Sequence, residues 1–560
     1  MKVKEEVAKR LEEKLQGELE RRKILLMLEK PKYADMGDLA FPCFELAKVF
    51  RKSPQNIACE LAGKIKDPII EKIEAVSGYV NVFLNKKMVA NEVVSGVIEL
   101  NENYGSINIG NAETMIIDFS SPNIAKPFSM GHLRSTVIGQ SLSLIAEKCG
   151  YKTVKINHIG DWGTQFGKLI VAYRLWGNEA KVKKDPIKEL LKLYVQFHEE
   201  AEQNSTLNDQ GREWFKKLEH GNEEALGLWK WFREESLSEF EKIYEELGIT
   251  FDSYHGEAFY NDKMQPIVDL MEEKGILEES EGAQVVPLAG MPPCLIKKRD
   301  GSTLYATRDL AAALYRQETY GFSKSLYVVG NEQSLHFQQL FAVLKEMGYN
   351  WYEGMSHISF GMMLKDGKKM STRKGKVVLL DEVIQEAVSL ALKNINEKNP
   401  SLENKDNVAR QVGTGAIIFH DLKHHRQHDI EFSLDDMLRF EGETGPYVQY
   451  THARASSLLV KGQFNKTDEV EVVDDELAWP VVTQLMAFPE VVKRSFHTYD
   501  PSQIAKHVVE LSRAFNQYYG AVRVLDDPIH KQARLTLVYS VKVVLKEGLR
   551  LLGLKAPEKM

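Results

Sequence analysis

The chain has 560 residues, which is too long for one hydrophobic core and suggests three or four domains at roughly 150 residues each. Its hydrophobic content of 43% and charged content of 27% are typical of a soluble globular protein. The formal net charge of −7 excludes a general electrostatic attraction to nucleic acid, so any RNA has to be held by local basic patches.

The start of the chain and its cysteines indicate a cytoplasmic protein. The opening, MKVKEEVAKRLEEKLQGELERRK, predicts a charged amphipathic helix without the apolar centre of a signal peptide. No later stretch approaches the about 20 apolar residues of a membrane span, so we expect no contact with a membrane. Cys43, Cys59, Cys149 and Cys294 lie far apart without a C-x-x-C pair, which argues against a disulfide framework and a cysteine zinc site.

The first predicted unit covers residues 1–85. It contains the charged helix, a loop over PKYADMGDLAFP, a helix over FELAKVFRK and a strand over GYVNVFLN. A connecting helix is then expected to begin at Asn85 and Lys86 and to end near Tyr104 and Gly105. We assign residues 86–111 to this connection.

From Met115 the pattern changes to strands that alternate with helices. We expect a strand over MIIDFSS, a helix from Leu133 to Ala146, a strand over KTVKINH and a helix within GDWGTQFGKLIVAYRLWG. This alternation predicts a parallel sheet with crossover helices. Residues from about 175 to 250 are rich in charge and lack strand alternation, so we expect them to form a helical insertion in the sheet domain.

The sheet is expected to resume with PPCLIKKRDGSTLYATRDLAAALY and KSLYVVGNEQSLHFQQLFAVL, each a strand followed by a helix. After ISFGMMLKDGKKMSTRKGKVVLLDEV the chain is predicted to be entirely helical as far as Met560. The predicted fold class is therefore α/β. A parallel-sheet domain covers residues 112–380, a helical connective region covers 381–439, and an all-helical domain covers 440–560.

The stretch SSPNIAKPFSMGHLRST, residues 120–136, directly follows an apolar run that ends at Phe119. A strand that ends in small polar residues and leads into a helix leaves free backbone N–H groups at the helix start, where anions bind well. The stretch therefore predicts a ligand that carries phosphate. Alone, Gly131 and His132 are weak indicators, because a glycine that closes a turn and a histidine that caps a helix are a common structural arrangement.

A second stretch, GMMLKDGKKMSTRKGK at residues 361–376, carries six Lys and Arg against one Asp. Small residues among Lys and Arg suit a mobile basic loop that closes on a polyphosphate and neutralises charge as a phosphoanhydride bond breaks. A surface charge run is the alternative interpretation.

Together these stretches resemble the two signatures of class I aminoacyl-tRNA synthetases, His-Ile-Gly-His and Lys-Met-Ser-Lys-Ser. SSPNIAKPF…GHLRST, NHIGDWGTQFG, RDGSTLYATRDLA, KMSTRKG and GPYVQYTHAR also stand in the order found in the arginyl-tRNA synthetase family. The resemblance covers essentially the whole chain. It implies a Rossmann-like catalytic domain, an additional N-terminal tRNA-binding domain and a C-terminal anticodon-binding bundle. Ser129 is one departure, because the family usually has a histidine there.

The resemblance implies catalytic roles for His132, Lys369, Ser371 and Lys374, and ATP contacts from Ser129, Gly131, His132, Lys369 and Met370. Glycine has no Cβ, so the adenine ring can lie against the backbone of Gly131. His132 and Lys369 would stabilise charge on the phosphates from opposite sides while the amino-acid carboxylate attacks and pyrophosphate leaves. ATP brings its own Mg²⁺, and we expect no dedicated metal site in the protein.

An arginine pocket has to pair a planar guanidinium with carboxylates, because its donors would otherwise be buried unpaired. The resemblance implies that Glu257, Tyr305 and Asp309 bind the guanidinium, and that Asn123 and Gln333 bind the backbone end of the amino acid. Tyr305 and Asp309 are four residues apart at a predicted helix start and therefore share one face. The alternative is that Tyr305 and Asp309 have structural roles, in helix capping and packing, and do not bind a substrate.

Single-stranded anticodon bases are usually read by aromatic stacking and by hydrogen bonds to their edges. The resemblance implies anticodon contacts from Tyr447, Arg454, Met560 and one aromatic of the pair Tyr518 and Tyr519, for which we take Tyr518. In the first unit, Tyr79 and Asn81 match the positions that read a base at the outer corner of the tRNA. The alternative for Tyr447 is a structural role in the core. The alternative for Tyr79 and Asn81 is that they are ordinary strand residues of a small sheet.

A histidine cluster comprises His420, His424, His425 and His428, and its spacing places several imidazoles on one helical face, as in some metal sites. No pattern of cysteine or carboxylate partners accompanies it. We therefore favour a solvated helix near the tRNA over a metal site.

The predicted function is activation of L-arginine with ATP and transfer of the arginyl group to the 3′ end of tRNA(Arg), by a monomer that needs bound tRNA for activation. A small-molecule nucleotidyltransferase and a non-catalytic RNA-binding protein derived from a synthetase are the alternatives. KMSTRKG and the long helical end argue against the first. The retained His132, Lys369, Tyr305 and Asp309 argue against the second, for which Ser129 would be the first sign of decay.

Overall fold

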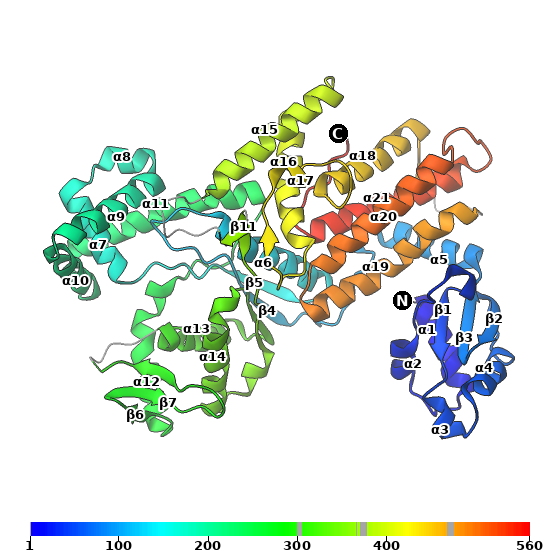
Figure 1. The fold of residues 1–560 in the computed structure, drawn as a ribbon, viewed down its shortest axis with the longest axis horizontal. Coiled ribbons are helices and arrows are strands. Elements are labelled where there is room, and N and C mark those ends of the chain that lie inside the picture. Colours follow the sequence, from blue (N-terminus) through cyan, green and yellow to red (C-terminus); the bar gives the residue numbers. More distant parts are fainter. Residues whose placement is uncertain (1, 300–304, 366, 370–377, 467–474) are drawn as a thin grey trace.

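The computed structural model describes residues 2–299, 305–365, 367–369, 378–466 and 475–560. A parallel sheet lies near the middle of the molecule, a helical insertion extends to one side, and a helical bundle extends to the other (Figure 1). The N-terminal unit, drawn in blue, lies at the end next to the bundle. Within the described part of the chain, no helix has both the length and the apolar character needed to cross a bilayer.

The N-terminal unit is an antiparallel sheet in the order β1-β3-β2, covered by short helices. Its strands are β1 (Leu39–Pro42), β2 (Ile70–Val76) and β3 (Tyr79–Leu84). Its helices are α1 (Lys2–Lys14), α2 (Arg21–Met27), η1 (Ala34–Met36), α3 (Leu46–Phe50) and α4 (Pro54–Ala62). The prediction that LAFP belongs to a loop is wrong, because these residues pair with β3 and bury Leu39 and Phe41 in the core.

The connecting helix α5 (Lys86–Leu100) begins where it was predicted. The side chain of Asn85 caps it by accepting a hydrogen bond from the backbone N–H of Met88. The short helix η2 (Asn101–Asn103) follows, and then Tyr104, whose buried hydroxyl donates to the carbonyl oxygen of Leu485 at 3.0 Å. The connection is therefore packed against the C-terminal bundle.

The central sheet is parallel, as predicted, with the strand order β10-β9-β4-β5. Its strands are β4 (Thr114–Asp118), β5 (Lys152–Ile156), β9 (Lys324–Tyr327) and β10 (Met355–His357). The accompanying helices are α6 (Met130–Lys148), α7 (Thr164–Trp176), α13 (Tyr305–Tyr320), η4 (Asn331–Gln333), α14 (Ser334–Glu346) and η5 (Asn350–Gly354). Since β4 lies between β5 and β9, the chain changes direction across the sheet at the carboxyl end of β4, where ligands bind in such folds.

A second, antiparallel sheet carries a strand that was assigned to the first. It has the order β6-β7-β8, with β6 (Glu278–Ser280), β7 (Ala283–Val286) and β8 (Cys294–Lys297). It follows η3 (Glu257–Lys263) and α12 (Met264–Glu273). The prediction that PPCLIKK resumes the parallel sheet is wrong, because β8 pairs with β7 and buries Cys294 and Ile296 in a separate apolar cluster with α12 and α13.

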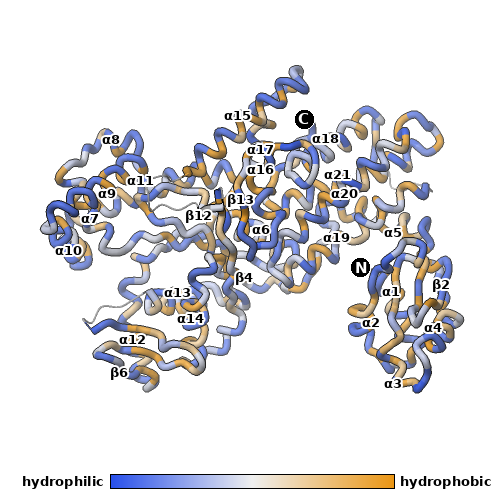
Figure 2. The backbone as a smooth tube through the Cα atoms, in the orientation of Figure 1, coloured by the Kyte–Doolittle hydropathy of each residue, from blue (hydrophilic) through white to orange (hydrophobic). Residues whose placement is uncertain are grey.

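The helical insertion is present as predicted. It consists of α8 (Glu179–Lys184), α9 (Pro186–Gln203), α10 (Thr206–Glu219) and α11 (Glu223–Leu247). Its helices alternate hydrophilic and hydrophobic residues along the tube of Figure 2, as helices with one buried face do. In α9, for example, Leu190, Leu193, Phe197 and Ala201 are buried at helical spacing.

The C-terminal half is mostly helical. Its helices are α15 (Leu380–Lys398), α16 (Lys405–Leu422), α17 (Leu434–Met437), α18 (Gly445–Gly462), η7 (Glu476–Ala478), α19 (Trp479–Thr498), α20 (Ser502–Ala521) and α21 (Lys531–Leu551). A short strand interrupts the described helices, so the prediction of an entirely helical end is wrong. This strand, β13 (Ile430–Glu431), pairs in parallel with β11 (Met363–Lys365), and Ile430 is buried against the sheet domain.

Helix α6 is tied to the helical region by a buried ion pair. Nε of Arg134 lies 3.1 Å from a carboxylate oxygen of Asp421, and both side chains are 1% exposed. The same guanidinium donates to the carbonyl oxygens of His428 and Arg426. Asp421 lies in the last turn of α16, and Arg426 and His428 lie between α16 and β13, so the three contacts fix the end of α16 and the segment after it against the sheet domain.

Removal of the Asp421 carboxylate should destabilise the protein strongly, because a buried guanidinium would lose its counter-charge. We expect Asp421→Ala to cost about 3–5 kcal/mol in the unfolding transition of the sheet domain. Denaturant unfolding monitored by fluorescence measures this loss. Asp209→Ala is the control, because it breaks the exposed ion pair with Arg212 and should leave the midpoint almost unchanged. Equal effects of the two substitutions would contradict the expectation.

Candidate active site

The segment after β4 crosses the carboxyl ends of the central strands. The backbone N–H of Ser120 donates to Oγ of Ser135 on α6 at 2.8 Å, and that of Ser121 donates to Oδ1 of Asn157 after β5 at 3.1 Å. Asn123 then forms a parallel bridge with Gly160. A Cβ at Gly160 would lie 2.2 Å from Oδ1 of Asn123, so a larger residue here would displace the Asn123 side chain.

The first signature lies at the start of α6. The helix begins at Met130 rather than at Leu133, with Ser129 as its N-cap, so His132 belongs to the first turn. The backbone N–H of Ser129 donates to Nδ1 of His132 at 3.1 Å, and Oγ of Ser129 lies 3.2 Å from the same nitrogen. Burial lowers the pKa of His132 to about 4, with a smaller contribution from the charge of Lys126. The imidazole is therefore neutral at pH 7, and its proton lies on Nε2 because Nδ1 accepts.

Gly131 is exposed, and an added Cβ would meet only Oγ of Ser129, at 3.4 Å. Packing within the described protein therefore does not explain why this position is glycine.

The second signature is partly described. Strand β12 (Lys368–Lys369) pairs with β11 as an antiparallel hairpin, so the predicted loop begins as regular structure. Lys369 is the last described residue of this hairpin, and Met370, Ser371 and Lys374 lie outside the described residues.

Beyond the second signature the chain returns to the first. The backbone N–H of Met130 donates to the carbonyl oxygen of Val378 at 3.1 Å, and that of Leu380 donates to the carbonyl oxygen of Phe128 at 3.0 Å. Ser129 and Leu379 thus form an antiparallel bridge. The residue directly after KMSTRKGKV is hydrogen-bonded to the start of the helix that carries His132.

Asp309 lies in the second turn of α13 between two histidines. Its Oδ2 is 2.6 Å from Nε2 of His336 on α14, and its Oδ1 is 3.8 Å from Nε2 of His158 after β5. Burial raises the pKa of the Asp309 carboxyl, but the hydrogen bond from His336 and the charges of both histidines outweigh burial and leave that pKa below its ordinary value. Burial lowers the pKa of His336, but the bond to Asp309 outweighs this and raises it.

Glu257 is the first residue of η3 and is held by its backbone, whose N–H donates to the carbonyl oxygen of Ile159 at 3.0 Å. The next N–H, of Ala258, donates to Asp161 at 2.8 Å. Burial raises the pKa of Glu257 to about 7; the charge of Arg308 opposes this shift, and the charges of Asp309 and Asp161 add to it. A carboxyl group whose ionisation is opposed by burial and by neighbouring carboxylates is suited to bind a cation.

The other predicted substrate residues lie at the same edge of the sheet. Asn123 follows β4, and Gln333 is exposed at the end of η4, after β9. Since the carboxyl ends of parallel strands meet at one edge, these two side chains come from adjacent strands. Tyr305 is the first described residue of α13 and is 64% exposed.

Three residues of this site had no role in the sequence analysis: His158, Asp161 and His336. His158 and Asp161 belong to NHIGDWG, directly after β5, and His336 belongs to NEQSLHF, directly after β9. Their positions after two predicted strands are what could have identified them as site residues, because ligands bind at the carboxyl ends of parallel strands. Their contacts with Asp309 and Glu257 depend on the fold and could not be read from the sequence.

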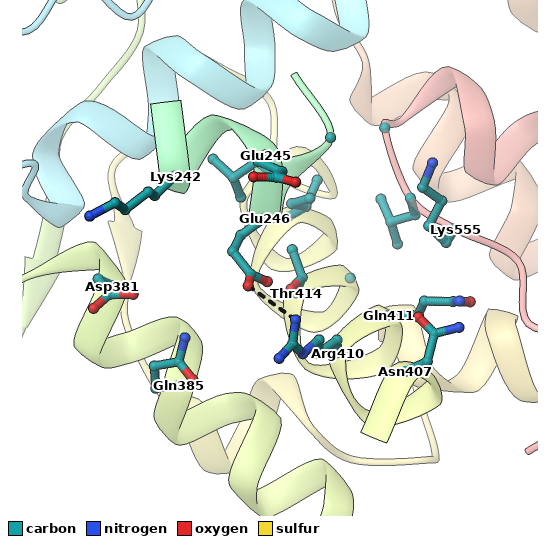
Figure 3. A pocket seen from close by; sticks show the side chains of 16 residues that line it. Lys242, Glu245, Glu246, Asp381, Gln385, Asn407, Arg410, Gln411, Thr414 and Lys555 are labelled. Carbon is teal, nitrogen blue, oxygen red and sulfur yellow. Dashed lines mark ion pairs between the residues drawn. The ribbon is translucent and has the colours of Figure 1, made fainter. Parts of the chain in front are cut away.

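A pocket of about 630 Å³ lies away from this site, between the end of α11, α15, α16 and the C-terminal tail (Figure 3). An ion pair of 3.5 Å between Arg410 and Glu246 lies within it. None of the predicted catalytic, ATP-binding or arginine-binding residues lines it.

The predicted RNA-binding residues of the bundle are partly gathered on α18 and α20. The hydroxyl of Tyr447 accepts from Nδ2 of Asn516 at 3.1 Å, and Arg454 bonds to the same asparagine. The guanidinium of Arg454 lies over the ring of Tyr519, 5.2 Å from its centroid. Tyr519 is 40% exposed, whereas Tyr518 is buried in the core at 2% exposure.

The remaining predicted contacts lie elsewhere. Met560 is half-buried, and its carbonyl oxygen accepts from Asn399 at 3.2 Å. Tyr79 and Asn81 share one face of β3, where Tyr79 packs edge-on against Phe44 and Asn81 is buried.

The histidine cluster does not form one helix face, because α16 ends at Leu422, before His424, His425 and His428. His420 lies in α16, where it is buried and its Nε2 donates to the carbonyl oxygen of Glu431 at 2.9 Å. Nδ1 of His424 donates to the carbonyl oxygen of His420 at 2.7 Å. Among the residues that the structure describes, no group of three or more His, Cys, Asp or Glu side chains is arranged to hold a metal ion.

Family models match nearly the whole chain. Residues 94–434 match the class I (R) tRNA synthetase catalytic domain, residues 448–560 match the DALR anticodon binding domain, and residues 1–84 match the arginyl tRNA synthetase N terminal domain. The parallel sheet, the two signatures and these matches define a class I aminoacyl-tRNA synthetase.

Individual proteins are similar over the full length. The chain is 58% identical to arginine–tRNA ligase 1 of Bacillus cereus and 59% identical to the arginine–tRNA ligase of Enterococcus faecalis, with 100% of each chain covered. Its fold is similar to the arginyl-tRNA synthetases of Thermus thermophilus, at a TM-score of 0.81 and 26% identity, and Plasmodium falciparum, at 0.82 and 25%. These structures cover 95% and 100% of this chain, and it covers 96% and 99% of theirs.

The chain belongs to the arginyl-tRNA synthetase family. It is a ligase that activates L-arginine with ATP and transfers the arginyl group to tRNA(Arg). The full-length match argues against both alternatives, the small-molecule nucleotidyltransferase and the non-catalytic RNA-binding protein.

The contacts at the start of α6 predict different costs for two substitutions. We expect His132→Ala to slow adenylate formation by about 10²–10³-fold, because a donor to the developing phosphate charge is lost. Ser129→Ala should cost less than about tenfold, because the backbone N–H of residue 129 still donates to Nδ1 of the imidazole. Single-turnover adenylate formation with tRNA present measures both. Comparable losses would show that the Ser129 hydroxyl itself carries a primary role.

Proposed function

We propose that arginine and ATP react in the crevice at the carboxyl ends of β4, β5 and β9, and that activation requires bound tRNA. The hydrogen bonds between residues 128–130 and 378–380 carry this proposal, because they join the ends of the two signatures at the start of α6. The segment that contains Ser371 and Lys374 then runs between Lys369 and this junction.

We assign the phosphate chemistry to the two signatures. Nε2 of His132 donates to a phosphate oxygen, and Lys369, Ser371 and Lys374 stabilise the departing pyrophosphate. The exposed backbone of Gly131, with Ser129 and Met370, contacts the adenosine, which explains a glycine that packing does not require. ATP enters as its magnesium complex, so that the metal ion arrives with the substrate.

We assign the guanidinium to Glu257, Tyr305 and Asp309. A planar guanidinium offers N–H donors along more than one of its edges, so it can pair with two carboxylates at one site. The pKa of one of these carboxyl groups, that of Glu257, is raised to about 7. Asn123 and Gln333 hold the ammonium and carboxylate end of the amino acid. The arginine carboxylate is the nucleophile, so the protein acts by positioning and charge stabilisation.

The tRNA contacts are proposed on the N-terminal and C-terminal domains. Tyr447, Arg454 and Met560 contact the anticodon, and the exposed Tyr519 replaces the buried Tyr518 as the stacking aromatic. Tyr79 and Asn81 contact the outer corner of the tRNA. We propose the domain limits 1–85, 86–111, 112–380, 381–439 and 440–560, a monomer, and a cytoplasmic location that suits four free thiols.

We base the proposed tRNA requirement on the contacts between the bundle and the residues that lead into the second signature. Arg426 donates to the carbonyl oxygen of Tyr499, at the turn between α19 and α20, and to that of Ser359, after β10. Asp429 accepts from the backbone N–H of Met362 at 2.6 Å, directly before β11. We infer that RNA docked on the bundle acts through Arg426 and Asp429 on the residues that lead into β11 and the second signature.

Pyrophosphate exchange tests the requirement. We expect RNA-free protein to show no arginine-dependent exchange, and tRNA with an oxidised 3′ end to restore it, because binding rather than charging closes the site. The coupling between the two sites is expected to be about 1–3 kcal/mol in binding. Robust exchange in the complete absence of tRNA would contradict the proposal.

Glu257 predicts a pH dependence of arginine binding. Its pKa lies at about 7, and the protonated form cannot pair with a guanidinium, so arginine binds more weakly as the pH falls below this value. We expect KM for arginine to rise about tenfold per pH unit below the pKa and to be constant above it. Aminoacylation assays across this range, at saturating ATP and tRNA, measure the profile.

Glu257→Gln is the control for this profile. The amide does not ionise, so KM for arginine should be high at every pH and the inflection should disappear. A flat profile for the unaltered protein would contradict the assignment of Glu257 to the guanidinium.

A further inference from the structure

We propose that His336 is a positioning residue for arginine: it holds one carboxylate oxygen of Asp309 so that the other oxygen is presented to the guanidinium. This inference rests on the proposed arginine site and adds to it a residue that does not itself contact the substrate.

The contact between the two side chains is short and directional. Nε2 of His336 lies 2.6 Å from Oδ2 of Asp309, and because a carboxylate oxygen can only accept, the imidazole donates. Hydrogen bonds of this length between an imidazole and a carboxylate are among the strong ones in proteins. The two side chains come from different helices, α14 and α13, so the bond fixes the carboxylate across a helix interface.

The other oxygen keeps its capacity to accept. Nε2 of His158 lies 3.8 Å from Oδ1, which is beyond hydrogen-bond distance. No hydrogen bond to Oδ1 is present among the residues described by the structure. A guanidinium N–H can therefore bind Oδ1 without displacing His336.

The place of His336 in the chain links the two ends of the amino acid. It follows Gln333 by three residues, where η4 runs into α14. In the proposed site Gln333 holds the backbone end of arginine. The segment after β9 thus positions both ends of arginine. Gln333 contacts the backbone end directly, and His336 acts on the guanidinium end by holding Asp309.

Three variants test the role of the hydrogen bond. His336→Leu removes the donor at similar volume, and we expect KM for arginine to rise about tenfold or more while KM for ATP changes little. His336→Gln places an amide N–H near the position of Nε2 and should restore most of the arginine KM. His357→Gln is the matched control, because His357 stacks on the neighbouring Phe337 and its Nε2 bonds to the backbone carbonyl of Val329, and it should leave KM for arginine unchanged.

A double variant separates this proposal from the proposed site. Asp309→Asn should raise KM for arginine, and adding His336→Leu to it should have little further effect, because the two act through one bond. If Asp309→Asn leaves KM for arginine unchanged, the arginine site itself is wrong. If Asp309→Asn raises it but His336→Leu does not, or if His336→Leu raises KM for ATP equally, or if His336→Gln fails to restore it, the positioning role is overturned.

Discussion

The catalytic half of the molecule depends on the backbone pairing between residues 128–130 and 378–380. This pairing stands at the first turn of α6, and so it fixes Ser129 and His132 relative to the end of the second signature. The start of the second signature is fixed separately, because β11 pairs with β13 on the helical side.

The two carboxylates of the proposed arginine site have unequal access to positive charge. Asp118 is paired with Arg316, and Asp161 with Arg233. Asp309 obtains one imidazole donor, and Glu257 is left with a raised pKa. Because burial raises the pKa of Glu257, we propose that a bound guanidinium would stabilise the ionised form of this carboxyl group.

Much of this arrangement could be predicted from the sequence. The alternation of strands and helices from Met115 correctly predicted the parallel sheet, whereas the ATP site at the two signatures stays a prediction. Strand β8 was assigned to the wrong sheet. Its residues predict a strand, but tertiary packing, which the sequence does not show, determines that β8 pairs with β7. Strand β13 has only two residues and exists because it pairs with β11. Tyr518 is buried and Tyr519 is exposed because of how α20 packs. The sequence shows two adjacent tyrosines and does not reveal which of them faces the core.

The central claim is that one crevice, at the carboxyl ends of β4, β5 and β9, holds both substrates. A crystal structure with a non-hydrolysable sulfamoyl analogue of arginyl-adenylate tests it most directly. We predict that the guanidinium lies within hydrogen-bond distance of Glu257 and of Oδ1 of Asp309, with the adenosine against Gly131. A guanidinium bound away from both carboxylates, or an adenosine bound away from the start of α6, would contradict it.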